Sequence, residues 1–243
     1  MGMLVRAGRL LGHWLLPQTC AHCREDLNPD WSDPLCGPCR AGLPQARPSF
    51  CLRCAEPVRE AGEFCRDCSG GAFACSLIRA AFLYQGPVPG LVHAFKYRGR
   101  RRAAEAAGRW MACLLPGLPE LSGHDAAAPV PLHPRRLRER GYNQARLLAL
   151  QVGAAAGLPV LDLLARVKPT RPQWGLGRDA RAQNLAAAFQ AGPAARGLSV
   201  LLVDDVCTSG ASLESCAAAL RRAGARRVGA FVFARQTLQP SEN

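Results

Sequence analysis

The sequence predicts an α/β fold in which a small cysteine-rich unit precedes a parallel sheet covered by helices on both faces. From residue 77 onward, short apolar segments of strand type alternate with longer segments of helical type, an order typical of parallel sheets. Residues 17–71 differ, because they are rich in proline and glycine and have no sustained helical period. That stretch also contains eight of the 12 cysteines in the 243-residue chain.

Each element is predicted from apolar runs or from Ala and Leu at helical spacing. The strands are expected at Leu77–Tyr84, Pro129–Leu132, Leu198–Val203 and Arg227–Phe233. The helices are expected at Val88–Tyr97, Arg102–Leu115, Asn143–Ala156 and Ser212–Ala223. The predicted organisation is an amphipathic helix over 1–16, the cysteine-rich unit over 17–72, the α/β domain over 73–236 and a tail over 237–243.

Composition limits the classes of function. Hydrophobic residues make up 49% of the chain, which excludes a disordered protein. The net charge of +13 indicates a polyanionic partner, although the high content of Ala, Arg, Gly and Pro is also typical of a GC-rich genome. Aromatic residues are only 6% of the chain, which argues against an aromatic-rich surface for stacking bases.

The cysteine-rich unit contains four Cys-x-x-Cys pairs, formed by Cys20, Cys23, Cys36, Cys39, Cys51, Cys54, Cys65 and Cys68. Each pair presents two thiolates from one tight turn, and two such turns complete the tetrahedral four-sulfur site of structural zinc. Pairing in chain order predicts two structural Zn²⁺ ions. The alternatives are a crossed arrangement, a single zinc, disulfides or a redox dithiol, with His22 as an alternative ligand at the first site.

Residues 1–17 have a short apolar stretch that His13 interrupts, and no small-residue cleavage site follows it. This pattern is not that of a signal peptide, so we expect a cytoplasmic protein whose thiols bind metal. Leu4, Leu11 and Leu15 lie on one face of the predicted first helix, which either docks on the cysteine-rich unit or contacts a membrane surface. No apolar run has the length of a transmembrane segment.

Two adjacent carboxylates directly follow an apolar strand in the segment Val200–Ser212. Because ligands bind at the carboxyl edge of parallel sheets, Asp204 and Asp205 are expected there, accepting hydrogen bonds from adjacent ribose hydroxyls. Thr208–Ser212 offer hydroxyls and backbone N–H groups to a phosphate at a helix N-terminus, and Gly210 permits close approach. The loop lacks Gly-Lys-Ser/Thr and is not the P-loop of NTPases. The alternative interpretation of this segment is a helix N-cap next to two solvent-exposed aspartates that bind no ligand.

On these residues the chain resembles the ComF (competence protein F) family. The resemblance implies a double zinc ribbon with four-cysteine sites, followed by a parallel-sheet type I phosphoribosyltransferase domain. The segment Val200–Ser212 resembles the phosphoribosyl pyrophosphate (PRPP) loop of such transferases. Further matching segments are Phe95-Lys96-Tyr97-Arg98-Gly99, Pro129-Val130-Pro131-Leu132 and Arg140-Gly141-Tyr142-Asn143-Gln144. The spacing of a mobile-loop segment is matched by Thr170, Gln173, Leu176, Arg181, Asn184, Ala188 and Phe189.

The resemblance implies a set of site residues. PRPP binding is expected at Val203, Asp204, Asp205, Val206, Cys207, Thr208, Ser209, Gly210, Ala211 and Ser212, with Asp204 and Asp205 as the catalytic pair. Mg²⁺ is expected with the pyrophosphate, and basic or pyrophosphate contacts are expected from Lys96, Arg98, Leu132, Arg135, Arg136 and Arg140. A mobile loop containing Gln173, Arg181 and Asn184 is expected to close over the ligand. Cys207, Ser209 and Ser212 depart mildly from the commoner residues at their positions.

The resemblance also implies a role in natural DNA uptake, in which the protein handles single-stranded DNA with the uptake machinery at the inner face of the membrane. The basic runs Lys96–Arg102 and Arg135–Arg146 are either phosphate contacts, an electrostatic surface for that DNA, or a solvated face. A transferase reaction would displace pyrophosphate at the ribose anomeric carbon, but the sequence indicates neither the acceptor nor a base. The alternatives are a salvage or modification phosphoribosyltransferase and a non-catalytic PRPP or nucleotide sensor.

The remaining cysteines are interpreted as ordinary core residues. Cys75, Cys113 and Cys216 are expected to be small buried side chains. Cys207 is expected either in the core or as a reactive thiol near a helix N-terminus.

Overall fold

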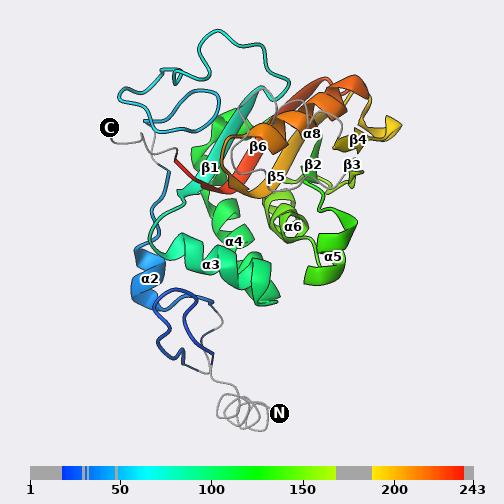
Figure 1. The fold of residues 1–243 in the computed structure, drawn as a ribbon. Helices are drawn as coiled ribbons and strands as arrows, with labels where there is room; N and C mark the ends of the chain where they lie inside the picture. The colour runs from blue at the N-terminus through cyan, green and yellow to red at the C-terminus, as the bar shows by residue number, and fades with distance from the viewer. Residues whose placement is uncertain (1–17, 29–30, 32, 47–48, 168–187, 238–243) are drawn as a thin grey trace, which may run out of the picture.

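The computed structural model describes residues 18–28, 31, 33–46, 49–167 and 188–237. Its centre is a four-stranded parallel sheet in the order β1-β6-β5-β2 (Figure 1). The strands of this sheet are β1 (Leu77–Leu83), β2 (Ala126–Pro129), β5 (Ser199–Cys207) and β6 (Arg227–Arg235). A second, antiparallel pair joins β3 (Leu164–Arg166) to β4 (Phe189–Ala191).

Helices cover both faces of the parallel sheet, which confirms the predicted α/β class. One face packs against α3 (Pro87–Tyr97), α4 (Arg101–Leu114) and α6 (Gln144–Ala156), and the other packs against α8 (Ala211–Arg222). The short helices are α2 (Gly37–Ala41) in the cysteine-rich unit and α5 (Pro134–Arg140) after β2. Single 3₁₀ turns lie at Leu115–Gly117, Pro119–Leu121 and Pro193–Ala195.

The two central strands are apolar because both of their faces are covered. Val200, Leu201, Leu202 and Val203 of β5 are fully buried, and alternate residues pack on opposite faces of the sheet. At its N-terminus α6 is capped by the Asn143 side chain, whose Oδ1 accepts the Ala145 N–H at 3.1 Å. The buried apolar run of β5 and the start of α6 beside Asn143 agree with the predicted strand and helix.

The boundaries of three strands, β2, β5 and β6, differ from the prediction by two residues or more. The short apolar strand predicted at Pro129–Leu132 is the edge strand β2 and lies at 126–129 instead, so Leu132 follows the strand rather than ending it. Its three alanines are fully buried, and the strand contacts β5 and α6. Alanine has low strand propensity, so only tertiary packing makes this segment a strand.

The predicted end of β5 at Val203 is also wrong, because the strand continues through both aspartates to Cys207. Its parallel register with β6 runs on to the Cys207↔Arg235 pair, and β6 likewise extends beyond Phe233. The ladder hydrogen bonds of β6 therefore hold the acidic pair in extended backbone, and the loop begins only at Thr208.

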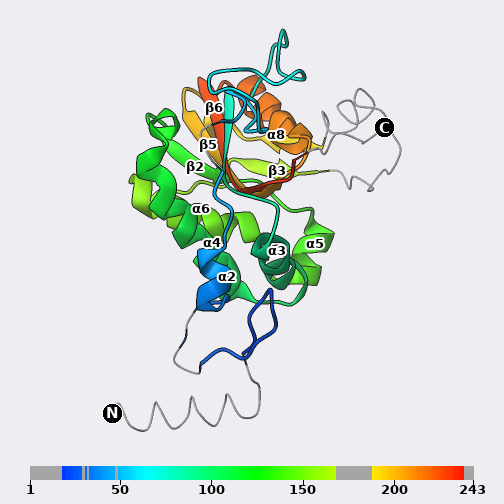
Figure 2. The same cartoon turned by 90° about the vertical axis from the view of Figure 1, so that its left-hand side faces the viewer.

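The cysteine-rich region forms two units that lie on opposite sides of the sheet, the first against the helical layer of α3 and α4 and the second on the α8 side (Figure 2). The first, described at 18–28, 31 and 33–42, contacts α3 so closely that a Cβ on Gly90 would lie 2.6 Å from the Ala21 carbonyl oxygen. Arg100 Nη1 also donates to the Thr19 carbonyl at 2.8 Å. The second unit, residues 49–76, packs on the α8 side. Between them, Gln45 bridges antiparallel to Phe82 of β1.

Three of the four remaining cysteines are buried as predicted, namely Cys75, Cys207 and Cys216. The prediction for Cys113 is wrong, because it lies on the exposed face of α4. Among the described residues, no helix combines the length and the apolar character that a membrane crossing needs.

Candidate functional site

The eight paired cysteines form two clusters, each made of two consecutive pairs along the chain. One cluster contains Cys20, Cys23, Cys36 and Cys39 and the other Cys51, Cys54, Cys65 and Cys68, with the sulfurs of each within 4.8 Å of one another. The Sγ atoms are 3.6 Å apart in the Cys23–Cys36 and Cys54–Cys65 pairs. Four sulfurs on a tetrahedral zinc lie roughly 3.8 Å apart, because a Zn–S bond is about 2.3 Å long. The geometry fits one structural zinc per cluster, and the first cluster is complete without the exposed His22.

Backbone N–H groups stabilise one thiolate in each cluster. Burial opposes ionisation of Cys20, but the N–H groups of its own turn and of Cys36 outweigh it and lower the pKa of the thiol to about 7. Cys51 has the same arrangement with Cys65 and its own turn, and its pKa is also lowered to about 7. Burial and the neighbouring sulfurs raise the pKa of Cys39. Four crowded thiols therefore ionise together only around a cation, whose binding releases protons.

The acidic pair lies at the carboxyl end of β5, and strand alternation sends its two side chains to opposite faces. Asp205 faces α3, where its Oδ1 lies 2.7 Å from the Lys96 Nζ. Asp204 faces α8, and its Oδ1 accepts the backbone N–H of Asp205 at 2.8 Å. Burial and then the Asp204 carboxylate raise the pKa of the Cys216 thiol on α8. The structure thus brings Lys96, from a motif more than a hundred residues earlier, into direct contact with the acidic pair.

The Asp204 carboxyl is perturbed by its surroundings. Burial is the largest cause, the Asp205 carboxylate adds to it, and together they raise the pKa of Asp204 to about 7. The charge of Lys96 and the Asp205 N–H act in the opposite direction without cancelling the rise. A carboxyl that changes protonation near neutral pH beside a cation is characteristic of ligand-binding and catalytic sites.

The loop after β5 combines exposed hydroxyls with a helix N-terminus. Thr208 and Ser209 are exposed, and Gly210 has a φ of 78°, a left-handed conformation that favours glycine. Ser209 Oγ accepts the Ala211 N–H at 3.4 Å. The helix α8 therefore begins next to the acidic pair with its N–H groups at the same edge of the sheet, an arrangement suited to an anion.

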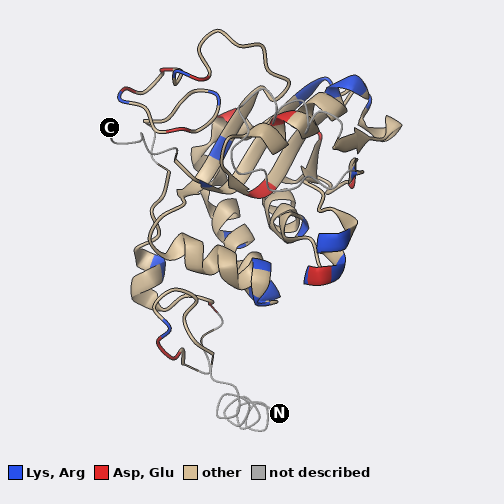
Figure 3. Cartoon of the chain, in the orientation of Figure 1, with Lys and Arg blue, Asp and Glu red and all other residues tan. Residues whose placement is uncertain are grey.

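The predicted basic residues divide into two groups. Lys96 is at the acidic pair, whereas Arg98, Arg135 and Arg136 are exposed where α3 ends and along α5 (Figure 3). Leu132 is half-buried in the segment between β2 and α5. Arg135 pairs with Glu139 at 2.8 Å. Arg140 Nη1 donates to Gln144 Oε1 at 3.1 Å.

One residue that the sequence did not single out is Tyr97. Its side chain is 67% exposed, the Arg140 guanidinium lies 5.2 Å from its ring centre, and the His93 ring lies 5.1 Å away. Tyr97 belongs to the matched Phe-Lys-Tyr-Arg-Gly segment, but its exposure follows only from the direction in which the last turn of α3 faces.

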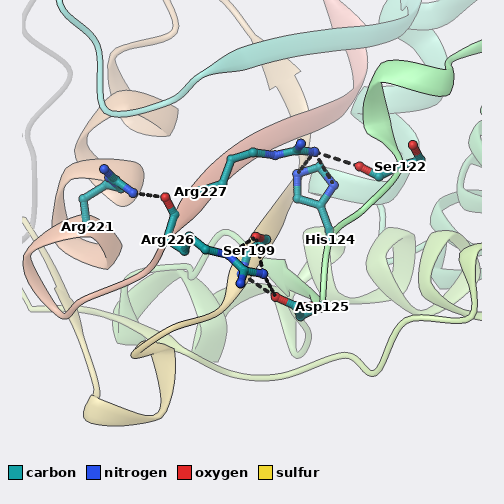
Figure 4. A network of polar contacts seen from close by, with 7 residues as sticks. All are labelled: Ser122, His124, Asp125, Ser199, Arg221, Arg226 and Arg227. Atoms are coloured by element: carbon teal, nitrogen blue, oxygen red, sulfur yellow. Dashed lines mark hydrogen bonds and ion pairs between the residues drawn. The ribbon is translucent and has the colours of Figure 1, made fainter.

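Charged residues at the amino edge of the sheet are held by one another and by the backbone (Figure 4). Arg226 Nη2 lies 3.1 Å from Asp125 Oδ2, which also accepts the Ser199 N–H at 2.7 Å. Arg227 Nη2 donates to the Ser122 carbonyl at 2.7 Å and lies beside buried His124. This network ties β2, β5 and β6 together at the edge opposite the acidic pair.

The expected mobile-loop residues Gln173, Arg181 and Asn184 lie outside the described residues, as does the predicted amphipathic helix over 1–16. All of the predicted PRPP-binding residues, Val203–Ser212, are described. They occupy the end of β5, the loop and the first turn of α8.

Comparisons with known proteins agree with this arrangement. Residues 11–69 match the double zinc ribbon domain, and residues 158–242 match the phosphoribosyl transferase domain. The chain is 28% identical over 223 residues to competence protein F of Haemophilus influenzae, covering 89% of this chain and 96% of that protein. It is 31% identical to the DNA utilization protein YhgH of Salmonella typhi, covering 83% of this chain and 96% of that protein. It is 26% identical to competence protein ComFC of Bacillus subtilis, covering 86% of both chains.

Metal analysis of the purified protein should give one zinc for each of the two clusters. Acidification should release the zinc, because the thiolate ligands take up protons. The variant Cys36→Ser should lose zinc from the first cluster, whereas Cys113→Ser, at an exposed cysteine outside both clusters, should keep both ions. A zinc content near zero with oxidised thiols would contradict the assignment.

The raised pKa of Asp204 predicts a pH-dependent stability. The folded state keeps the proton up to about pH 7, whereas the unfolded chain loses it near 3.8, so the free energy of unfolding should fall as pH rises between these values. The variant Asp204→Asn removes this loss and should be more stable than the wild type at pH 8, on the order of 1–3 kcal/mol. Urea unfolding of both proteins from pH 5.5 to 8 measures the difference, and a constant difference would disprove the prediction.

Proposed function

Because the chain belongs to the family of competence protein F and the DNA utilization protein YhgH, we propose that it binds PRPP with Mg²⁺ and handles single-stranded DNA during natural DNA uptake. The observation that carries the PRPP part is the acidic pair at the end of a buried parallel strand, followed directly by a hydroxyl-rich loop and a helix N-terminus. This order of groups suits a sugar phosphate, because carboxylates accept from hydroxyls and N–H groups donate to phosphate.

The acidic pair and loop divide the proposed ligand between them. Asp204 and Asp205 would accept hydrogen bonds from the ribose hydroxyls, and Thr208–Ser212 would hold the phosphate. The Lys96 Nζ lies 2.7 Å from the Asp205 Oδ1, so its positive charge would lie close to the negatively charged ligand. The arginines at the start of α5, Arg135 and Arg136, are proposed to meet the pyrophosphate.

If the protein turns PRPP over, pyrophosphate leaves the anomeric carbon as an acceptor attacks it. Bound Mg²⁺ would neutralise negative charge on the departing pyrophosphate. In this proposal the carboxylates of Asp204 and Asp205 orient the ribose and offset positive charge that develops on its ring. A salvage or modification transferase would show turnover with one small acceptor, whereas a sensor would bind PRPP without turnover.

A surface formed by the end of α3, the start of α4 and α5 supports the DNA part of the proposal. This α3–α5 surface carries the exposed residues Tyr97, Arg98, Arg101, Arg102, Arg135, Arg136 and Arg138. Single-stranded DNA needs cations along its backbone and flat side chains for its bases, and this surface offers arginines around an exposed tyrosine. We infer a cytoplasmic location, because eight cysteines kept as metal ligands need a reducing compartment. The proposed role in DNA uptake would place the protein at or near the inner face of the membrane.

Calorimetric titration with PRPP, with and without Mg²⁺, tests the ligand. At pH 8, above the pKa of Asp204, the wild type should bind saturably, and the double variant Asp204→Asn/Asp205→Asn should lose binding because the ribose acceptors lose their charge. Asp125→Asn, an acid of the same type at the opposite edge of the sheet, is the matched control and should keep binding. Failure of the folded, zinc-loaded wild type to bind would refute the PRPP assignment.

Fluorescence anisotropy with a labelled single strand at several salt concentrations tests the DNA surface. Tyr97→Ala should weaken binding about tenfold without changing the salt slope, because stacking involves no counterions. Arg98→Gln with Arg102→Gln should lower the slope of log K against log salt by about 0.7 for each phosphate that the arginines no longer neutralise. Arg196→Gln, an exposed arginine near the amino edge, is the control. Equal effects of all three variants would reject the α3–α5 surface.

A further inference from the structure

We propose that the second four-cysteine cluster positions the phosphate loop, so that metal bound there sets the affinity for the ligand. The loop is Thr208–Gly210, and its proposed ligand is the phosphate of PRPP. This inference therefore rests on the proposed function. Thr208 and Ser209 are exposed. The position of the loop thus depends on what holds its two ends, at Cys207 and at the first turn of α8.

The first end is held through Arg235. Cys207 is 2% exposed, and its Sγ accepts a hydrogen bond from Arg235 Nη1 at 2.8 Å. The same guanidinium, which is 3% exposed, donates from Nε and Nη2 to Glu56 Oε2 at 3.0 and 2.6 Å. Because Glu56 lies two residues after Cys54, the end of β5 is linked by one buried arginine to the second cluster.

The second end is held through Glu214. Its backbone N–H donates to the Gly210 carbonyl at 2.9 Å, which closes the first turn of α8 after the loop. Its carboxylate Oε2 lies 2.8 Å from the Arg53 Nη2 and accepts the Cys75 N–H at 3.3 Å. Arg53 lies between the ligands Cys51 and Cys54, and its Nη1 donates to Cys68 Sγ at 3.5 Å. This end of the loop is therefore tied to the same cluster.

The two anchors depend on the fold of the cysteine turn from which they come. Glu56 and Arg53 belong to a short hairpin in which the Cys51 N–H donates to the Glu56 carbonyl at 2.6 Å. Four-cysteine turns of this kind are ordered by their metal, because thiolates without a cation repel one another. Metal in the second cluster fixes the two side chains, and they fix both ends of the loop.

The first cluster provides an internal contrast. The described contacts of its unit go to α3, α4 and the segment between them, through Ala21 at Gly90, Arg40 at Trp110 and Thr19 at Arg100. Disturbance of an ion pair beside this cluster should therefore leave the phosphate loop in place. Asp33, whose Oδ2 lies 3.1 Å from Arg40 Nη1, supplies the matched ion pair.

The test uses the full-length, zinc-loaded chain and three isosteric variants. Glu56→Gln and Glu214→Gln each remove one anchoring charge, and Asp33→Asn is the control beside the first cluster. Hydrogen exchange of residues 207–214 reports loop order without ligand, and titration with Mg²⁺–PRPP reports affinity. Zinc content and thermal unfolding report whether each variant retains its metal and its fold.

We expect both anchor variants to speed exchange in 207–214 and to weaken PRPP binding about tenfold, while Asp33→Asn matches the wild type. The Glu214 side chain is 33% exposed, so Glu214→Gln should fold even if Glu56→Gln does not. Faster loop exchange with unchanged zinc content supports the positioning role, whether or not PRPP binds. Failure of the wild type to bind PRPP counts against the proposed function alone. Unchanged exchange and affinity in Glu214→Gln would overturn the inference.

Discussion

The pairing of β5 with β6, buried on both faces, is the constraint on which the site depends. The apolar run Val200–Val203 packs alternately against the two helical layers, so a slip by one residue would reverse every side chain. The register continues to the Cys207↔Arg235 pair and keeps the acidic residues in extended backbone. Asp204 and Asp205 consequently leave the strand on opposite faces, and any ligand that touches both must lie across the end of the strand.

Bringing two carboxylates together at a partly buried strand end is unfavourable unless a cation or a proton compensates. This protein uses both, since Lys96 pairs with Asp205 while Asp204 keeps its proton until about pH 7. The lysine reaches the pair because α3 is held from two sides. Gly90 lets the first cysteine unit approach the helix, and the Tyr142 hydroxyl donates to the Phe95 carbonyl at 2.5 Å.

The cysteine units therefore do more than extend the chain at one end. Together they contact both layers around the acidic pair, the first through α3 and the second through Glu214 of α8 and Arg235 of β6. Buried charge pairs such as Arg235–Glu56 add little net stability on average, but they hold a defined geometry because an unpaired buried charge costs several kcal/mol. Such pairs suit the alignment of a loop whose own side chains are exposed.

Much of this molecule follows from local spacing. Each Cys-x-x-Cys turn places its own two sulfurs at one site, and the alternation of apolar segments determines the α/β class, but the structure decided that the turns combine in chain order. The sequence also predicted Asp204, Asp205 and Lys96 as candidate site residues, but the Lys96–Asp205 contact, the exposure of Tyr97 and the extension of β5 to Cys207 required the tertiary structure. Those features join segments far apart in the chain, and only packing decides which distant side chains meet. For the same reason, the placement of the two cysteine units on opposite sides of the sheet could not be derived from their spacing.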